Sequence, residues 1–206
     1  MMILRAQISS IAGGLFLAIG FSLSATAGVV SPQQLDWCKN MSDAYSPDLR
    51  IIGCTAAIQS GQWSGKDLAW AFTDRCFGYF IKRDYDSAVV DCTETIRLDP
   101  DDAYPYQLRG SAYLNKGNYS AAITDFNKVI SLEPGSAYPY ELRGSAYLGK
   151  GDYSNAITDF NKVISLDPQN AAAFFNRGNA KAANGDTAGA AADIAHAKEL
   201  QPSIEQ

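Results

Sequence analysis

The sequence predicts an all-α fold in which antiparallel helix pairs stack side by side. Residues 103–136 and 137–170 are two copies of one 34-residue segment and agree at 27 of 34 places. Weaker copies occupy residues 69–102 and 171–205. Within a copy, apolar residues recur at helical spacing on both sides of a short interruption rich in glycine. A period of this length indicates a helical array rather than one globular core.

The copy that begins at Ala137 illustrates the expected helix, turn and helix. Tyr140 and Tyr147 belong to the apolar stripe of its first half, and Phe160 and Val163 belong to that of its second half, with Gly151 between the halves. Each stripe fits one face of a helix with 3.6 residues per turn. The two helices of a pair therefore expose apolar faces that neighbouring pairs must cover.

Three places of the copy are the most regular. A small residue or cysteine stands at place 8, alanine at place 20 and proline at place 32: Cys76, Gly110, Gly144, Gly178; Ala88, Ala122, Ala156, Ala190; Pro100, Pro134, Pro168, Pro202. This pattern resembles the tetratricopeptide repeat of exported bacterial proteins. The resemblance implies a right-handed solenoid of antiparallel helix pairs, with repeats at 69–102, 103–136, 137–170 and 171–206.

The N-terminal segment predicts export. Arg5 is followed by a run of apolar and small residues without charge, and Ala25-Thr26-Ala27 supplies the small residues of a signal-peptidase site. We expect residues 1–27 to be a cleaved signal peptide and the protein to be periplasmic or secreted. An uncleaved membrane anchor is the alternative, but glycines and serines interrupt a segment that is short for a full span.

The charge of the chain excludes some partner classes. The formal net charge is −5 for the whole chain, and Arg5 is the only charged side chain in residues 1–27. An acidic protein is repelled by nucleic acid and by anionic membrane surfaces. We therefore expect no nucleic-acid partner and no membrane partner after cleavage.

Four cysteines fit an oxidising compartment. Cys38, Cys54, Cys76 and Cys92 allow three pairings. Cys76 and Cys92 lie symmetrically about a predicted turn, so antiparallel helices bring them to one level, and Cys38 and Cys54 have the same separation. We predict disulfides Cys38–Cys54 and Cys76–Cys92, since free buried thiols are the expectation only for a cytosolic protein. No pair has the C-x-x-C spacing of redox motifs or zinc knuckles.

The first cysteine pair lies in a further, degenerate helical pair within residues 28–64. Its helices are predicted over 32–44 and 48–60, with Ser46 as a helix cap, Pro47 in the first turn and Gly61 as the C-terminal stop. A four-residue insertion, 65–68, separates this pair from the regular repeats. Each disulfide closes a loop that stabilises the fold by about 3 kcal/mol in the chain-entropy model.

Two charged places are invariant in the array. Arginine stands at place 7 and aspartate at place 23 of every copy: Arg75, Arg109, Arg143, Arg177; Asp91, Asp125, Asp159, Asp193. We expect these charges to meet, within a repeat or across the junction with its neighbour. A structural ladder of charge-assisted hydrogen bonds is favoured over a ligand site.

The resemblance places the first helix of each pair on the concave side, with places 2, 5, 9 and 12 directed into a groove. The candidate partner-binding residues are Trp70, Thr73, Phe77, Tyr104, Gln107, Ser111, Tyr138, Glu141, Ser145, Phe175 and Asn179. This aromatic strip with small polar groups suits a peptide. Packing between repeats is an equally good reading of the aromatic residues. Chaperone-tail receptors of the family use lysine in the groove, and this chain has none at those places.

Catalysis finds no support in the sequence. His196 is the only histidine, and no nucleophile-elbow signature or glycine-rich phosphate loop is present. We expect no enzymatic activity, cofactor or metal. Carboxylate pairs such as Asp101 and Asp102 follow Pro100 in a turn, where solvation explains them.

Two functions remain. The first is an exported scaffold that binds a peptide or protein partner in the groove. The second is a structural protein that forms homodimers through its last repeat, where the apolar side chains of places 21 and 28 are replaced by Ala191 and Lys198. Such a replacement is expected in a terminal repeat, whose outer face is more polar.

Overall fold

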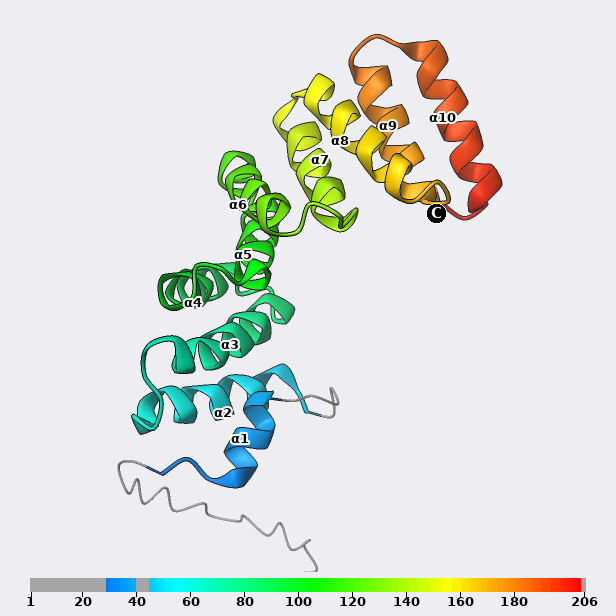
Figure 1. Ribbon diagram of the computed structural model, residues 1–206. Coiled ribbons are helices and arrows are strands. Elements are labelled where there is room, and N and C mark those ends of the chain that lie inside the picture. Colours follow the sequence, from blue (N-terminus) through cyan, green and yellow to red (C-terminus); the bar gives the residue numbers. More distant parts are fainter. Residues whose placement is uncertain (1–28, 40–44, 205–206) are drawn as a thin grey trace, which may run out of the picture.

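The computed structural model describes residues 29–39 and 45–204, and these form helices stacked pair after pair (Figure 1). The predicted signal peptide, residues 1–27, lies outside the described residues. The described α-helices are α1 Pro32–Lys39, α2 Pro47–Ser60, α3 Ala69–Ile81, α4 Tyr85–Leu98, α5 Ala103–Asn115, α6 Tyr119–Leu132, α7 Tyr138–Lys150, α8 Tyr153–Leu166, α9 Ala171–Ala183 and α10 Thr187–Leu200. A 3₁₀ turn, η1 Gly65–Leu68, corresponds to the four-residue insertion.

The hydrophobic core is divided among the junctions of the stack. One cluster joins Cys76 and Cys92 of the α3–α4 pair to Leu108 and Ala112 of α5. The next cluster joins Phe126 of the α5–α6 pair to Ala146 of α7, and a third joins α7 and α8 to α9. Each cluster thus combines one helix pair with the first helix of the next. A single pair could not bury its own apolar residues, which is why stacking supplies the stability of the array.

The two helices of a pair come closest where place 8 faces place 24. A Cβ added to Gly110 would lie 2.8 Å from the ring of Phe126, and one added to Gly144 would lie 3.0 Å from the ring of Phe160. Both phenylalanine rings are fully buried. Glycine is therefore required at place 8 because the ring of the second helix occupies the space of a side chain.

Helix ends are formed in the same way along the array. Asp84, Asn118, Asp152 and Asp186 each accept a hydrogen bond from a backbone N–H of the following helix. The residue before each of the last three caps has the left-handed conformation and is a glycine: Gly117, Gly151 and Gly185. Arg83 holds the equivalent position in the first repeat, with φ +61°, at a steric cost that glycine avoids.

The N-terminal pair is the most divergent. The helix expected over 32–44 is described as far as Lys39, and residues 40–44 lie outside the described residues. Ser46 caps α2, Pro47 stands in its first turn, and Gly61 follows it with φ +69°. In the place of the repeat aspartate stands Gly53, where a Cβ would lie 2.3 Å from the carbonyl oxygen of Gln34. The α1 and α2 backbones are thus in direct contact.

The stack has an inner and an outer side. α3 contacts α5, α5 contacts α7, and α7 contacts α9, whereas the second helices of the described pairs have no comparable contacts with one another. The first helices therefore lie on the inner side. Among the described residues, none of the helices combines the length and the apolar character that crossing a bilayer requires.

Candidate functional site

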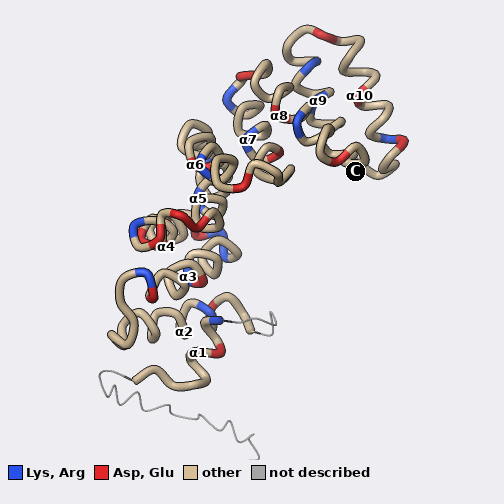
Figure 2. The backbone as a smooth tube through the Cα atoms, in the orientation of Figure 1, with Lys and Arg blue, Asp and Glu red and all other residues tan. Residues whose placement is uncertain are grey.

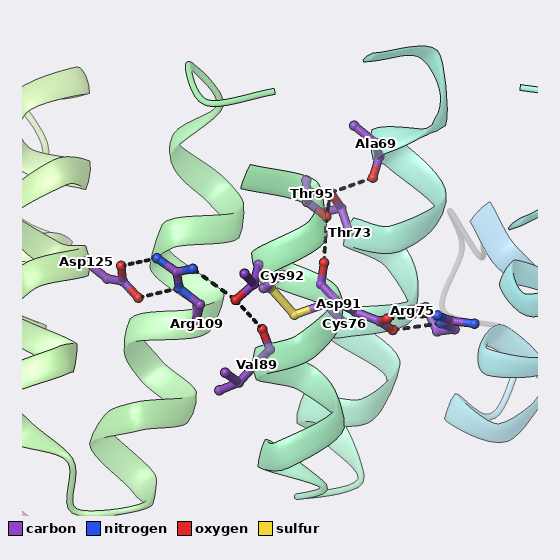
Figure 3. The surroundings of a disulfide bond; sticks show 11 residues. Ala69, Thr73, Arg75, Cys76, Val89, Asp91, Cys92, Thr95, Arg109 and Asp125 are labelled. Carbon is purple, nitrogen blue, oxygen red and sulfur yellow. Dashed lines mark hydrogen bonds and ion pairs between the residues drawn. A yellow bond between two sulfur atoms is a disulfide. The ribbon is translucent and has the colours of Figure 1, made fainter. Parts of the chain in front are cut away.

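The charged places 7 and 23 form a ladder inside the array. In every repeat the arginine Nε and Nη2 donate to the two carboxylate oxygens of the aspartate, as in Arg109 and Asp125 at 2.9 and 2.7 Å (Figure 3). The same two bonds join Arg75 to Asp91, Arg143 to Asp159, and Arg177 to Asp193. The pairs lie within a repeat and link its two helices.

A third bond from each arginine reaches the preceding pair. Arg109 Nη1 donates to Thr93 Oγ1 of α4 at 3.0 Å, and Arg143 Nη1 donates to Asn127 Oδ1 of α6 at 2.5 Å. Hydrogen bonding to Asp125 raises the pKa of the Arg109 guanidinium above its ordinary value. Since the donors are used inside the stack, the ladder is architectural and offers no free charge to a ligand.

The structure divides the predicted groove residues into two sets. Phe77 packs against the α3–α4–α5 core, and the guanidinium carbon of Arg50 lies 4.9 Å from its ring centroid. Tyr104 and Tyr138, in contrast, remain 41% and 51% exposed on the inner helices. The remaining candidates are half-buried on α3, α5, α7 and α9: Trp70, Thr73, Gln107, Ser111, Glu141, Ser145, Phe175 and Asn179.

An open pocket of about 560 Å³ lies at the N-terminal end of this inner side. It brings together three predicted groove residues, Trp70, Thr73 and Tyr104, from two consecutive first helices. The other lining residues were not singled out as site residues from the sequence, and most are charged: Lys66, Asp67, Ala69, Asp74, Asp99 and Asp102. We name this set of nine residues the α3–α5 pocket. The η1 insertion supplies Lys66 and Asp67 to it.

Asp74 is a half-buried charge of the α3–α5 pocket. Its Oδ1 lies 3.3 Å from Nη1 of Arg50 in α2. Burial raises the pKa of the Asp74 carboxyl to about 6, although Arg50 and Lys39 act in the opposite direction. Burial, together with the negative charge of Asp74, also raises the pKa of the Tyr104 hydroxyl. The carboxylates therefore give the pocket a negative electrostatic potential, which Arg50 and Lys39 offset only in part.

The acidic turn before α5 could have been noticed in the sequence. It reads Pro100-Asp101-Asp102, whereas the equivalent turns read Pro134-Gly135-Ser136 and Pro168-Gln169-Asn170. Asp102 is exposed, as expected for a turn, but it also lines the pocket and accepts a hydrogen bond from the backbone N–H of Tyr104 at 3.0 Å. Elsewhere in the described stack, single acidic and basic residues are scattered among uncharged ones (Figure 2).

His196 lies on α10, away from the α3–α5 pocket. Its ring is in edge contact with Phe174 at 4.5 Å between centroids, and its Nδ1 lies 3.2 Å from Glu199. Within residues 29–39 and 45–204, no three His, Cys, Asp or Glu side chains are grouped as a metal ion would require. The side chains of α10 that face away from α9, Ala191 and Lys198 among them, are exposed.

Comparison with known proteins agrees with this geometry. The family model for the TPR repeat matches residues 110–151 and 144–185. No curated protein sequence matches the chain.

Several solved structures have a similar fold. MamA 41-end from Desulfovibrio magneticus RS-1 has 19% identity and a TM-score of 0.74, covering 86% of this chain and 100% of that one. YrrB, a TPR protein with an unusual peptide-binding site, has 17% identity and a TM-score of 0.73, covering 83% and 86%. The first TPR of Spaghetti (RPAP3), bound to the HSP90 peptide SRMEEVD, has 24% identity and a TM-score of 0.56, covering 61% and 99%. Residues 110–185 thus match the family model for the TPR repeat, and the described chain shares the all-helical stack of pairs with these solved structures.

Proposed function

We propose that this protein is an exported scaffold that binds a peptide segment of a partner protein along the inner side of the array. The observation that carries the proposal is the pair of exposed tyrosines, Tyr104 and Tyr138, at the same place of consecutive inner helices. Large aromatic side chains left exposed on a regular, stacked surface are typical of binding surfaces, because flat rings bury area at low entropic cost.

Two of the structural relatives support the kind of ligand. YrrB has an unusual peptide-binding site, and the first TPR of Spaghetti is bound to an HSP90 peptide. The spacing of the inner helices repeats along this chain, so an extended peptide meets equivalent side chains at each repeat. The two tyrosines and the α3–α5 pocket then provide consecutive contacts.

Export is part of the proposal. Residues 1–27 have the composition of a signal peptide. Disulfides Cys38–Cys54 and Cys76–Cys92, which both occur in the structure, persist in oxidising compartments such as the periplasm. We therefore place the partner in the periplasm or outside the cell.

The experiment is affinity capture from periplasmic extract with the full chain and with a Tyr104→Ala/Tyr138→Ala variant. We expect the wild type to retain one or a few proteins that the variant loses. If both versions capture the same proteins at the same yield, the inner side is not the binding surface.

A matched control separates the groove from general effects of substitution. Thr124→Ala/Thr158→Ala changes two exposed residues at one place of the consecutive second helices. Their hydroxyls bond only to backbone carbonyl oxygens of their own helices, Ser120 O and Ser154 O. This variant is expected to capture the same proteins as the wild type.

A further inference from the structure

We propose that the α3–α5 pocket binds the side chain of an arginine in the partner peptide, between the rings of Trp70 and Tyr104 and the carboxylates of Asp74 and Asp102. The proposal rests on the proposed function, because it assigns one residue of the peptide that the inner side binds. The N-terminal end of the groove then selects for arginine, whereas the rest of the groove accepts different side chains.

The first argument is the form of the pocket. Trp70 of α3 and Tyr104 of α5 stand at place 2 of consecutive repeats, and both line one cavity of about 560 Å³. Trp63 holds the indole of Trp70 in an edge contact, with 5.4 Å between ring centroids. A side chain entering from the groove therefore meets aromatic surface that the preceding segment has already fixed in orientation.

The second argument is the balance of charge. Four aspartates and one lysine line the pocket. Asp99 is paired with Lys66 at 3.0 Å and Asp74 with Arg50 at 3.3 Å. Within residues 29–39 and 45–204, Asp67 and Asp102 form no ion pair. The pocket thus retains negative charge beside its aromatic rings, which favours a cation over an anion or a neutral group.

Two cations of the chain itself, Lys39 and Lys66, lie at the α3–α5 pocket. The Nζ of Lys39 lies 5.5 Å from the Trp70 ring centroid, so a face of this ring accommodates a positive charge. Lys66 reaches Asp99 with a side chain that is 70% exposed. An exposed lysine of this kind can move aside at little cost, because surface ion pairs are weak.

Arginine fits this environment better than lysine. Its planar guanidinium stacks on aromatic faces and offers several donors in one plane to carboxylates, and it is more weakly hydrated than an ammonium group. The pocket combines stacking surfaces with carboxylates from two helices, which are the two features that arginine uses together. A glutamate at the same position of the peptide is expected to be disfavoured.

The test uses the full chain and a positional-scanning library of labelled decapeptides. In each mixture one position is arginine, citrulline, lysine or glutamate, and dissociation constants are measured by fluorescence polarisation. Citrulline has the shape of arginine without its charge. We expect arginine to bind about tenfold more tightly than citrulline at one position of the peptide, and the ratio to fall as salt is added.

Variants locate the preference. Asp102→Asn removes one carboxylate and keeps a residue that caps helices well. It is expected to reduce the arginine-to-citrulline ratio to roughly threefold or less. Asp186→Asn makes the same change at the cap of α10 and is expected to leave the ratio unchanged. Lys66→Gln removes a competing cation and is expected to increase the ratio, an effect that loss of structure would not produce.

Each outcome decides the question. Equal binding of arginine and citrulline mixtures at every position overturns the arginine site but leaves the proposed function intact if Tyr104→Ala/Tyr138→Ala weakens both. A ratio that persists in Asp102→Asn and Trp70→Leu also overturns it, as does binding of the glutamate mixtures as tight as that of the arginine mixtures. Binding of no mixture overturns the proposed function together with the site.

Discussion

The N-terminal and C-terminal halves of the stack close the same contact by different means. In α5–α6 and α7–α8 a phenylalanine ring lies on a glycine, Phe126 on Gly110 and Phe160 on Gly144. In α1–α2 and α3–α4 a disulfide joins the two helices at that level, Cys38–Cys54 and Cys76–Cys92, of which Figure 3 shows the second. The contact needs two helix axes held close together, and either a buried ring or a covalent bond provides it.

The disulfides occur where the repeat is otherwise weakest. The described part of α1 covers Pro32–Lys39, and it meets α2 at Gly53, where no side chain is present. The first pair also lacks the arginine–aspartate bridge, because Trp37 and Gly53 stand at those places. In the next repeat Arg83 replaces the glycine of the turn. Covalent links therefore compensate for interactions that the later repeats make by packing and hydrogen bonding.

The largest effect on stability is expected where a phenylalanine ring packs on a glycine. Phe126→Ala leaves a cavity under a fully buried ring and should lower the free energy of unfolding by about 3–5 kcal/mol. Urea unfolding followed by circular dichroism measures it. A loss below about 1 kcal/mol would show that the ring does not carry this contact.

Replacing the disulfide of α3–α4 by a glycine–phenylalanine contact tests directly whether the two contacts are equivalent. Cys76→Ser/Cys92→Ser should lose about 3 kcal/mol of stability. Cys76→Gly/Cys92→Phe, which copies the later repeats, should recover most of it and should no longer respond to reductant at this link. Unfolding curves with and without dithiothreitol provide the measurement, and a Gly/Phe variant as unstable as the Ser/Ser variant would contradict the equivalence.

The N-terminal half contains Asp74, whose contribution to the free energy of unfolding depends on pH. The folded-state pKa of Asp74 is raised to about 6, above its unfolded value of about 4. The folded state thus binds the proton more tightly. The contribution of Asp74 to stability is therefore greatest below pH 4 and is lost as the pH rises from 4 through 6, by about 2 kcal/mol.

Asp74→Asn removes this contribution, so its stability should fall less than that of the wild type between pH 4 and pH 7. The difference between the two proteins cancels the other carboxyl groups. Parallel slopes in unfolding experiments would mean that Asp74 has an ordinary pKa. Burial raises the pKa of Asp74, whereas Arg50 of α2 and Lys39 of α1 lower it.

Substitution of Arg83, the turn residue at place 15, should change the free energy of unfolding by less and in the opposite direction. Arg83→Gly relieves a left-handed conformation and is expected to stabilise the protein by about 0.5–1 kcal/mol. Gly151→Ala, at the equivalent turn with φ +82°, should destabilise it by about 1 kcal/mol. Thermal melts of both variants suffice, and stabilisation by neither or by both would contradict the argument.

The smallest effect is expected at the end of the stack. Ala191→Ser/Lys198→Gln changes two exposed residues and should alter stability by less than about 0.5 kcal/mol. The large apolar side chains exposed in the described residues include none from α9 or α10. We therefore expect light scattering to show a monomer for both proteins. A stable dimer that the substitutions dissociate would favour self-assembly through the last repeat.

The sequence by itself determined the period, and with it the helix pairs and the pairing of the cysteines. Gly110 and Gly144 recur with Phe126 and Phe160 at a fixed separation, and the cysteines recur with the same separation. Because a repeat array is stabilised by contacts between neighbours in sequence, local patterns are enough to predict it. The arginine–aspartate pairs were expected on the same ground, as partners at fixed places.

Only the tertiary structure decided which of the predicted groove residues are exposed and which are covered. Phe77 and Tyr104 both lie at predicted groove places, but Phe77 is covered by Arg50 and the core, whereas Tyr104 remains exposed. The α3–α5 pocket likewise combines a turn, an insertion and two helices from different parts of the chain. Contacts between an insertion, a turn and regular repeat helices leave no periodic pattern in the sequence. They depend on how consecutive helix pairs are oriented.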